Sequence, residues 1–414
     1  MDFQLSDDQR ALRSGMRDLL GAVFARDRLR AAVERDGALD RSLWRELGAA
    51  GFFALRLPED EGGVGLGLPE AVLLFEEAGR ALLPGPLVAT HLAAGRVKGA
   101  AEGEAVVTAV DGELPVAHLA EADAVLLVGG EAVDAGDARE LPQARELPDG
   151  RTLTGEALRA FLAAARPVRS MDPLTPLHRA PAGAAAAAGR VPTGRLPTAE
   201  GGRAASERTR ADTDRAPVGS ERPGADTGRV AGAYTGVGAD RVLGAVERTP
   251  AHAGRLRFEA ALLTAAEQLG SAVRTTEAAV QHARDREQFG SPIGSFQAVK
   301  HLCADMLART EPARAAVYAA AVTGDPLEIA AAKLLADEAA VRNARDCLQI
   351  HGGMGFTWEA DVHLHLKRAW LRAASWLTGA AAEELLAAGL GAAGPLPRSS
   401  AAYGRPVPEA GGEG

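Results

Sequence analysis

Cysteine is nearly absent from this chain, because only Cys303 and Cys347 occur among its 414 residues. Both lie in apolar runs with a helical pattern, so we expect two reduced, buried thiols and neither a disulfide framework nor a cysteine metal site. Long apolar runs are also missing, which excludes a membrane-spanning helix. The first residues, MDFQLSDDQR, are acidic where a signal peptide would be basic and then apolar. We therefore expect a cytoplasmic protein.

Positive charge is in deficit, since 46 Lys and Arg residues face 55 Asp and Glu residues and the formal net charge is −9. This balance argues against a nucleic-acid partner, which would require a basic surface. Aromatic residues are scarce at 4%, whereas alanine and glycine are abundant. Such a composition is typical of a closely packed helical protein, and the length is sufficient for two to four domains.

Helical periodicity dominates residues 1–97, which we predict to be an N-terminal helical domain. Ser6 is expected to cap the first helix, and Pro69 to occupy the first turn of a later one. The pattern then changes to short β-branched runs bounded by turns, such as EAVVTAV, LPVAHL and DAVLLVGG, with VRSMDPLTPLHR as a further candidate strand. Residues 98–182 are therefore predicted to form a reduced central β domain.

Large apolar residues almost vanish between residues 183 and 254, so we expect a low-complexity, disordered insertion there. Strong helical patterning returns over residues 255–390, where four long amphipathic helices with short connections predict a four-helix bundle. The tail, residues 391–414, is rich in Pro and Gly and is expected to be flexible. The predicted fold class is thus mainly α with a small central β domain.

Two glycine turns fall at predicted ends of bundle helices. Gly352 and Gly353 follow one helix, and a left-handed helix cap would explain them without any ligand. In DREQFGSPIGSFQ, however, Arg286 ends another helix and Phe289 begins a tight turn. A cation, a ring and a tight turn suit a phosphate that lies next to a flat ring system. The pattern alone leaves both interpretations open.

The combination of these motifs resembles the acyl-CoA dehydrogenase family. An R-x-x-F-G-x-x-I-G-x-F-Q run precedes Q-I-x-G-G-x-G-F by about sixty residues, as in the family's C-terminal domain, and SLWRELGAAGFFALRLPEDEGGVGLG is similar to its N-terminal domain. The resemblance covers residues 1–97 and 256–390 well, the strand region weakly and the insertion not at all. It implies an N-terminal helical domain, a central β domain and a C-terminal four-helix bundle, assembled as a tetramer.

The resemblance also implies FAD as the cofactor, shared between neighbouring subunits. Arg286 would contact its diphosphate with Phe289 and Gln297 close by, and Gln349, Gly352 and Gly353 would line the adenosine and diphosphate part of an FAD bound mainly by the partner. Thr378 matches the threonine of a further family motif, Tyr-Glu-Gly-Thr, and completes the predicted cofactor-binding set.

The catalytic base that the family requires is missing from its usual position. Counted from Gly353, the glutamate of the Tyr-Glu-Gly-Thr stretch falls on Trp376, and the alternative position of a minority of relatives falls on Ala260. Glu259 is the weak candidate that remains. One residue along a helix turns a side chain by about 100°, so Glu259 would act only if the helix start were rewound. Otherwise it is a solvated acid in a first turn.

The family's central domain also carries T-E-x-x-x-G-S-D and Trp-x-Thr-x-Gly segments that grip the flavin ring, and this sequence shows neither. Three interpretations follow. The chain is an FAD-dependent dehydrogenase of acyl-CoA thioesters, from fatty acid or sterol breakdown, with electron-transfer flavoprotein as acceptor. Alternatively it is a non-catalytic subunit of a hetero-tetramer with a related dehydrogenase chain, or an inactive relic.

Other candidate chemistry has plainer explanations. His363 and His365 are two residues apart, which places them on different sides of a helix and disfavours a metal site. His301, Cys303 and Asp305 alternate around a helix and lack an oxyanion hole, so they do not form a nucleophilic triad. Glu267 is expected to be a buried or inter-subunit hydrogen-bonding residue. Trp358 and Trp370 are expected to pack on one helix face.

Overall fold

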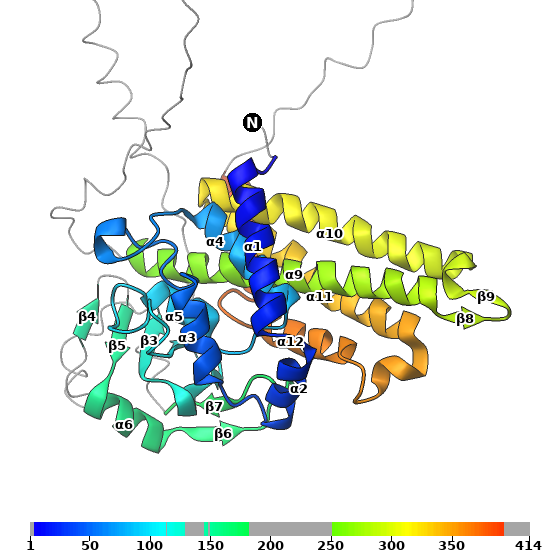
Figure 1. Cartoon of the computed structure of the whole chain (residues 1–414). Coiled ribbons are helices and arrows are strands. Elements are labelled where there is room, and N and C mark those ends of the chain that lie inside the picture. Colours follow the sequence, from blue (N-terminus) through cyan, green and yellow to red (C-terminus); the bar gives the residue numbers. More distant parts are fainter. Residues whose placement is uncertain (1–3, 113, 129–144, 148–149, 182–250, 393–414) are drawn as a thin grey trace, which may run out of the picture.

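The structure, a computed structural model, describes residues 4–112, 114–128, 145–147, 150–181 and 251–392. Most of the predicted insertion and nearly all of the predicted tail lie outside these residues. The domain boundaries expected from the sequence therefore stay proposals. The architecture is mainly helical, with an N-terminal group of helices, a small β region and a group of long C-terminal helices (Figure 1).

Residues 4–99 form five α-helices: α1 (Asp7–Val23), α2 (Arg26–Glu34), α3 (Arg41–Ala49), α4 (Leu68–Arg80) and α5 (Leu87–Ala93). The predicted cap of α1 is confirmed, because the Ser6 hydroxyl accepts from the Gln9 N–H and the Gln9 side chain accepts from the Ser6 N–H. Pro69 lies in the first turn of α4 as expected. The capping chemistry of these helices was therefore readable from the sequence.

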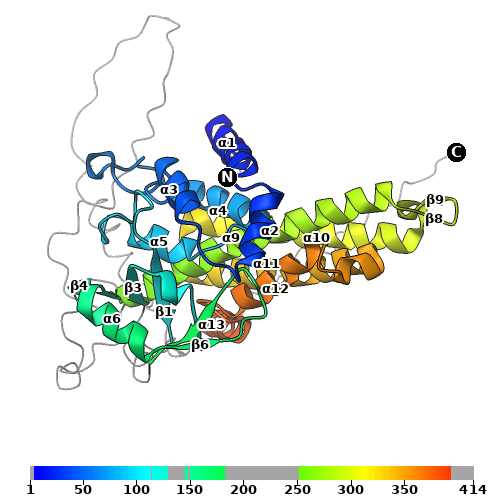
Figure 2. The ribbon, with the colours of Figure 1, turned by 60° about the horizontal axis from the view of Figure 1, so that its bottom comes forward.

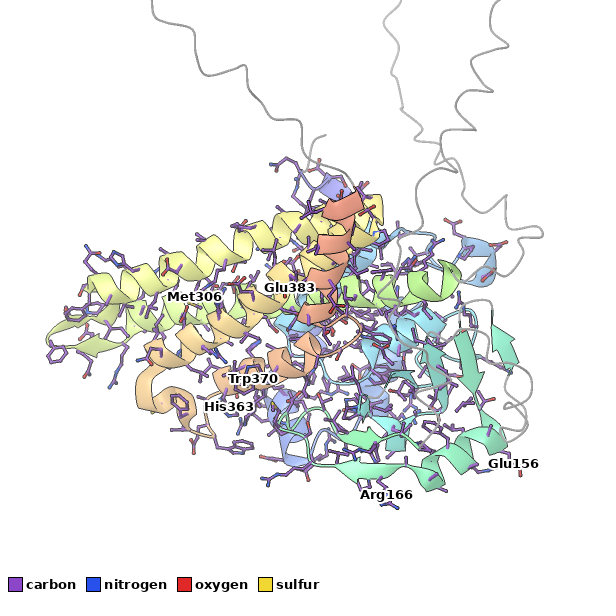
Figure 3. All side chains as sticks on the ribbon, turned by 180° about the vertical axis from the view of Figure 1, so that it is seen from behind. Glu156, Arg166, Met306, His363, Trp370 and Glu383 are labelled. Atoms are coloured by element: carbon purple, nitrogen blue, oxygen red, sulfur yellow. The ribbon has the colours of Figure 1, made fainter. Side chains whose placement is uncertain are left out.

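The described residues of the β region form two small sheets. One has the strand order β1-β3-β5-β4, from strands Val107–Asp111, Ala124–Val128, Gly150–Leu153 and Arg145–Leu147, and β1 and β3 are parallel. The other is antiparallel with the order β2-β7-β6, from strands Val116–Ala117, Leu177–Arg179 and Arg166–Val168. Helix α6 (Gly155–Ala164), which the sequence analysis did not predict, covers this region, with Glu156 and Arg166 at its far edge (Figure 3).

The C-terminal part consists of α9 (Ala251–Asp285), α10 (Gln297–Thr323), α11 (Pro326–His351), α12 (Val362–Ala373) and α13 (Gly379–Ala392). The first three are long and lie side by side (Figures 1 and 2). The prediction of a long fourth helix is wrong, because α12 ends at Ala373 and the backbone of Trp376 takes a positive φ of 63° before α13 starts. Helix α9 also begins four residues before the predicted start of the bundle.

Trp358 and Trp370 do not share a helix face, so the prediction that they pack on one face is wrong. Trp358 precedes α12, and its ring stacks on His363 with centroids 5.1 Å apart. Trp370 lies on α12 and accepts the Arg345 guanidinium over its ring.

Helices α4 and α9 cross at two glycines. A Cβ on Gly79 would lie 2.0 Å from the carbonyl oxygen of Glu267, and a Cβ on Gly270 would lie 1.9 Å from that of Glu76. Both distances are impossible for real atoms, so the crossing requires glycine on each helix. One hydrophobic core continues from the N-terminal helices through this crossing to α10, α11 and the inner strands. The α4–α9 crossing therefore joins the N-terminal helices to the bundle.

We expect Gly270→Ala to lower the free energy of unfolding by about 3 kcal/mol or more, because overpacking a closed backbone contact forces the helices apart. The matched control is Gly15→Ala on α1, where a Cβ would meet nothing within 4 Å. That change should be neutral or stabilise the protein by up to about 1 kcal/mol. Denaturant unfolding of both variants measures the two free energies. Equal stability of the two variants would contradict the claim that the α4–α9 crossing requires glycine at position 270.

Buried histidine makes stability depend on pH. His365 is 6% exposed on α12, and burial, together with four nearby arginines, lowers its pKa from 6.5 to about 3. Below pH 6.5 the unfolded chain binds a proton here that the folded chain does not. The free energy of unfolding should therefore fall as the pH drops from about 6.5 towards 3, by up to about 1.4 kcal/mol per pH unit from this residue. Denaturant titrations at pH 7 and pH 5 measure the loss of unfolding free energy between the two pH values. This loss should be smaller for His365→Leu than for the unaltered chain, and an identical loss would refute the role of His365.

Candidate functional site

Most of the predicted cofactor residues meet at one end of the bundle. Helix α9 ends at Asp285 and a short hairpin follows, β8 (Glu287–Gln288) and β9 (Ser291–Pro292), which lies at the far end from the β region (Figure 1). The rings of His282 on α9 and His351 on α11 stack with centroids 4.0 Å apart. This contact brings the two glycine turns, far apart in the sequence, to the same end.

The side chains at this end are exposed. Phe289, at the tip of the hairpin with a φ of 55°, is 95% exposed. The remaining members of the set, all exposed, are Arg286, Gln297, Gln349, Gly352 and Gly353. Within the described part of the chain, no carboxylate pairs with Arg286. A free guanidinium, two amides and a bare ring on one surface can bind a phosphate group and a flat ring from outside.

The conformation of Gly352 differs from a left-handed helix cap. Its φ is 59° and its ψ is −141°, a region that residues with a Cβ almost never take. Gly353 has an ordinary φ, and a Cβ at either position would meet nothing within 4 Å. Thus Gly352 is needed for the backbone, whereas the open space around Gly353 is available to a molecule outside this chain.

Thr378 lies apart from this set. Its carbonyl and hydroxyl oxygens accept from the Ala382 and Ala381 N–H groups, so it caps α13. Trp376, two residues earlier, lines a central pocket between the β region and the bundle. Trp376, the residue on which the resemblance places the family's usual base, therefore lies at this pocket and not at the bundle end.

The central pocket has a volume of about 150 Å³ and is bounded by α5, β1, β2, α9 and α12. Three ion pairs lie in or beside its wall: Asp111 with Arg257, Asp172 with Arg368, and Glu267 with Arg372. All of their side chains are at least mostly buried. The first pair is further fixed because the Trp376 backbone N–H bonds to Asp111, whose pKa is raised by burial against the opposing charge of Arg257.

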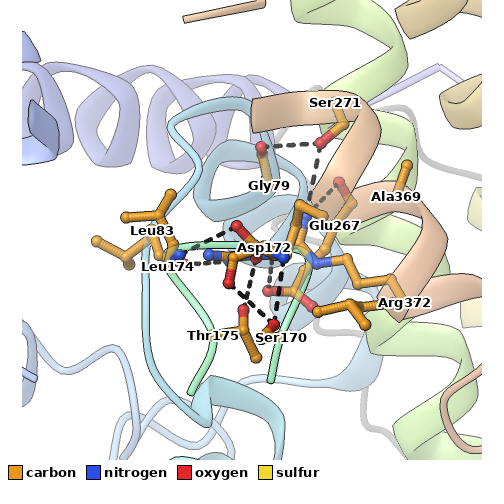
Figure 4. Close-up of polar contacts among 12 residues, drawn as sticks. Gly79, Leu83, Ser170, Asp172, Leu174, Thr175, Glu267, Ser271, Ala369 and Arg372 are labelled. Carbon is orange, nitrogen blue, oxygen red and sulfur yellow. Dashed lines mark hydrogen bonds and ion pairs between the residues drawn. The ribbon is translucent and has the colours of Figure 1, made fainter. Parts of the chain in front are cut away.

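Asp172 is the centre of the best-connected cluster (Figure 4). It lies in the loop between β6 and β7, pairs with the Arg368 Nε, and accepts 2.6 Å from the Thr175 hydroxyl and 3.1 Å from the Leu174 N–H. Burial alone would raise the pKa of Asp172, but Arg368 and these hydrogen bonds outweigh it and the pKa lies below its ordinary value. Arg368 also donates to the Leu83 carbonyl, so this cluster holds the β region against α12.

The central pocket does not fit a flavin ring in this structure. Pockets that bind ligands of drug or cofactor size usually have volumes of about 300 Å³ or more. Here the space is half of that, and the carboxylates Asp111, Asp172 and Glu267 in or beside its wall are each paired with an arginine. The bundle end, by contrast, offers unpaired donors. The residues present therefore suit the diphosphate end of FAD and not its ring.

Glu259 lies elsewhere. It borders a second pocket of about 270 Å³ together with Arg56, from which it accepts at 2.9 Å, and it also accepts from Arg255 at 3.1 Å. Burial alone would raise its pKa, but the two arginines lower it below the ordinary value. A carboxylate so strongly paired is a poor proton acceptor. Its neighbour Ala260 is fully buried in the core.

Sequence reasoning missed the polar residues of the central pocket. Asp111 ends β1, His118 follows β2 with a φ of 53°, and Thr264 lies on α9. His118 and Thr264 are each a single polar residue inside an apolar run, which is the one signal that marked them, whereas Asp111 is followed by Gly and Glu and carries no such signal. Glu267 is buried as expected and bonds to Arg372 of the same chain, at 2.8 Å.

No group of three or more His, Cys, Asp or Glu side chains in the described ranges is placed to hold a metal ion. None of the described helices is both long and apolar enough to span a membrane. His363 and His365 are buried on α12, and both cysteines are free, Cys347 buried and Cys303 half-buried.

Asp172→Ala should lower the free energy of unfolding by about 3–5 kcal/mol, because it leaves the Arg368 guanidinium buried without its counter-ion. The control is Glu338→Ala, which removes an exposed pair with Arg342 on α11. That pair should contribute less than about 1 kcal/mol. Denaturant unfolding measures both, and a loss below 1 kcal/mol at Asp172 would show that the cluster does not hold the two regions together.

Comparison with known proteins gives a consistent result. The model of the acyl-CoA dehydrogenase C-terminal domain matches residues 254–385, and that of the N-terminal domain matches residues 6–99. Acyl-CoA dehydrogenase IpdE2 of Mycobacterium tuberculosis is 32% identical over 369 residues, which is 88% of this chain and 91% of that protein. IpdE2 of Mycolicibacterium smegmatis is 31% identical over 88% of this chain and 93% of its own length.

Solved structures show the same fold. A chain of the ChsE4-ChsE5 complex from Mycobacterium tuberculosis superposes with a TM-score of 0.63 at 22% identity, over 96% of this chain and 100% of that one. Glutaryl-coenzyme A dehydrogenase in complex with glutaryl-CoA gives a TM-score of 0.66 at 18% identity, over 94% and 97%. The resemblance drawn from the motifs is confirmed: this chain belongs to the acyl-CoA dehydrogenase family of flavoprotein oxidoreductases.

Proposed function

We propose that this chain supports the α,β-dehydrogenation of an acyl-CoA thioester as the subunit of a hetero-oligomer that contributes part of an FAD site. The observation that carries the proposal is the contrast between two regions. The bundle end presents unpaired, exposed donors, whereas the central pocket is small and closed by its own ion pairs. This chain would thus supply the part of the site that binds the diphosphate of FAD, and not the part that binds the flavin ring.

At the bundle end, Arg286 would hold the diphosphate, with Phe289 and Gln297 beside it. Gln349, Gly352 and Gly353 would line the adenosine side, where the absence of side chains lets backbone approach the ligand. FAD, when bound, supplies the acceptor for the hydride that leaves the substrate. This chain's part is to bind and orient the end of FAD that does not react.

The reaction also needs a base next to the thioester carbonyl, and this chain does not offer one at the family's positions. Trp376 and Ala260 carry no titratable group, and Glu259 is held by two arginines. We infer that a related chain supplies the base and the ring site. The solved ChsE4-ChsE5 complex, one chain of which has this fold, is named for two components, which supports such an arrangement here.

A dehydrogenase that acts alone, with Glu259 as an unusual base, is the second candidate. The third interpretation, an inactive relic, is supported by no observation among the described residues. In either active form the protein would act in the cytoplasm, in fatty acid or sterol breakdown, with electron-transfer flavoprotein as the acceptor. Glu259→Gln separates the two active forms, since it should abolish turnover only if the chain is active alone.

Flavin content tests the proposal directly. The chain purified alone should be colourless, and it should become yellow, and be bleached by acyl-CoA, only when co-purified with a related dehydrogenase chain encoded beside it. Absorbance of the bound flavin is the measurement. A yellow, bleachable protein without any partner would overturn the hetero-oligomer, and no flavin in either sample would overturn the FAD site.

In the co-purified assembly, Arg286→Ala should weaken FAD binding roughly tenfold to a hundredfold, the usual loss for a hydrogen-bonded charge. The control is Arg284→Ala, an exposed arginine two residues earlier on α9. It should leave FAD binding within about twofold. Titration of the FAD-depleted assembly with FAD measures both variants, and equal affinities would remove Arg286 from the site.

A further inference from the structure

The second pocket contains an arginine that uses only one of its three nitrogens. This pocket lies between the segment that follows α3, the end of α5 and the start of α9. Arg56 lines it, and the Arg56 Nη1 donates to the Glu259 Oε2 at 2.9 Å. The Nε and Nη2 of Arg56 have no hydrogen-bond partner among the described residues. These two nitrogens form the edge of a guanidinium that matches the two oxygens of a carboxylate.

The charges beside the second pocket favour an anion. Glu259 also accepts from the Arg255 Nε at 3.1 Å, so two guanidinium groups share one carboxylate. At the rim, Glu61 and Arg96 add one charge of each sign, and both side chains are exposed. One positive charge is therefore in excess. An anion in the pocket would offset this charge, whereas a cation would add to it.

His91 places a buried acceptor at the same pocket. Its side chain, on α5, is 5% exposed, and its Nδ1 donates to the Phe52 carbonyl at 3.3 Å. Burial and the charge of Arg56 lower the pKa of His91 to about 4, so the ring is neutral at pH 7. The Nε2 is then an acceptor, and it has no partner among the described residues. Buried polar atoms are normally paired, and a carboxylate has no hydrogen to donate here.

The fold holds both groups in place. Gly95 lies so close to Leu57 that a Cβ at position 95 would be 2.7 Å from the Leu57 Cδ2. A Cβ on Gly63 would be 2.1 Å from the Leu57 carbonyl oxygen, so the backbone of this loop is closed on itself next to Arg56. The His91 ring packs edge-on against Phe75 with centroids 5.3 Å apart. The pocket is therefore built from packed segments.

Size and wall composition limit the molecule that fits. The volume is about 270 Å³, whereas a cavity of about 150 Å³ is sufficient for benzene. Phe53, Leu92 and Leu256 line the pocket and are 1%, 8% and 5% exposed. There is thus room for one ring against apolar side chains and for a few polar atoms. In so small a space, the group that donates to His91 has to be close to the group that binds Arg56.

We propose that the second pocket binds a small 2-hydroxycarboxylic acid with an apolar body. The carboxylate accepts from the Nε and Nη2 of Arg56, and the neighbouring hydroxyl donates to the His91 Nε2. The apolar body lies against Phe53, Leu92 and Leu256. Glu259 keeps its bond to the Arg56 Nη1 and so holds the guanidinium in position. The site is distinct from the bundle end and from the central pocket, and it does not require that the chain binds FAD.

The probe is mandelate, whose two enantiomers are titrated separately into the full chain at pH 7 and followed by calorimetry. We expect saturable binding of one molecule per chain for at least one enantiomer. Mandelamide keeps the ring and the hydroxyl but lacks the charge, and it should bind at least tenfold more weakly. Phenylacetate lacks only the hydroxyl, and it should bind at least threefold more weakly. No saturable binding of either enantiomer, or equal binding of mandelamide or phenylacetate, would overturn the proposal.

Arg56→Lys tests the contact with the carboxylate. Lysine keeps a cation beside Glu259, so the fold should be retained, but it lacks the paired N–H groups, and mandelate should bind about tenfold more weakly. The control is Arg45→Lys, an exposed arginine on α3 outside the pocket, which should bind mandelate within about twofold of the unaltered chain. Equal affinities of the two variants would refute the contact with Arg56.

His91→Phe tests the contact with the hydroxyl. The new ring can still pack against Phe75, but it offers no acceptor. Mandelate should bind about threefold more weakly or worse, whereas phenylacetate, which has no hydroxyl, should bind as it does to the unaltered chain. Unchanged mandelate affinity in a folded His91→Phe protein would refute the contact. If this variant fails to fold, Arg56→Lys and the comparison of mandelate with phenylacetate on the unaltered chain decide.

Discussion

The close crossing of α4 and α9 determines where the functional groups carried by α9 lie. At Gly79 and Gly270 the two backbones touch, with no space for even a methyl group. Helix α9 is thereby fixed in direction and in rotation about its axis. Its rotation sets Thr264 and Glu267 towards the central pocket, and its direction carries Arg286 to the far end of the bundle. Two sites on one helix thus depend on a single contact.

Two of the three ion pairs around the central pocket, Asp111 with Arg257 and Asp172 with Arg368, join the β region to the C-terminal helices. A buried pair contributes little net stability compared with apolar packing, but loss of one partner is costly because the other charge remains buried. Asp172, Arg368 and Leu83 join a loop of the β region, α12 and the end of α4 in one cluster. Such pairs fix orientation.

The sequence predicted local structure better than it predicted the site. Ser6 and Pro69 announced helix starts because capping depends on neighbouring residues only. The extent of the fourth bundle helix was misjudged because the apolar pattern continues through Trp376, and only the tertiary contact of its N–H with Asp111 accompanies the break there. The bundle-end residues were found through their motifs. The pocket residues were not, because pairs such as Asp172 and Arg368 are almost two hundred positions apart and no local pattern connects them.

The bundle end is difficult to explain as a product of folding alone. Phe289 places a whole ring in solvent, and the space beside Gly352 and Gly353 is empty of this chain's own atoms. Neither feature adds to the core, and exposed aromatic rings lower solubility. Helix stability would be served better by an ordinary residue than by glycine at position 353. These costs are offset only if something covers the surface, and an anionic, ring-bearing ligand held by a second subunit would bury the ring, fill the space and pair with Arg286 at once.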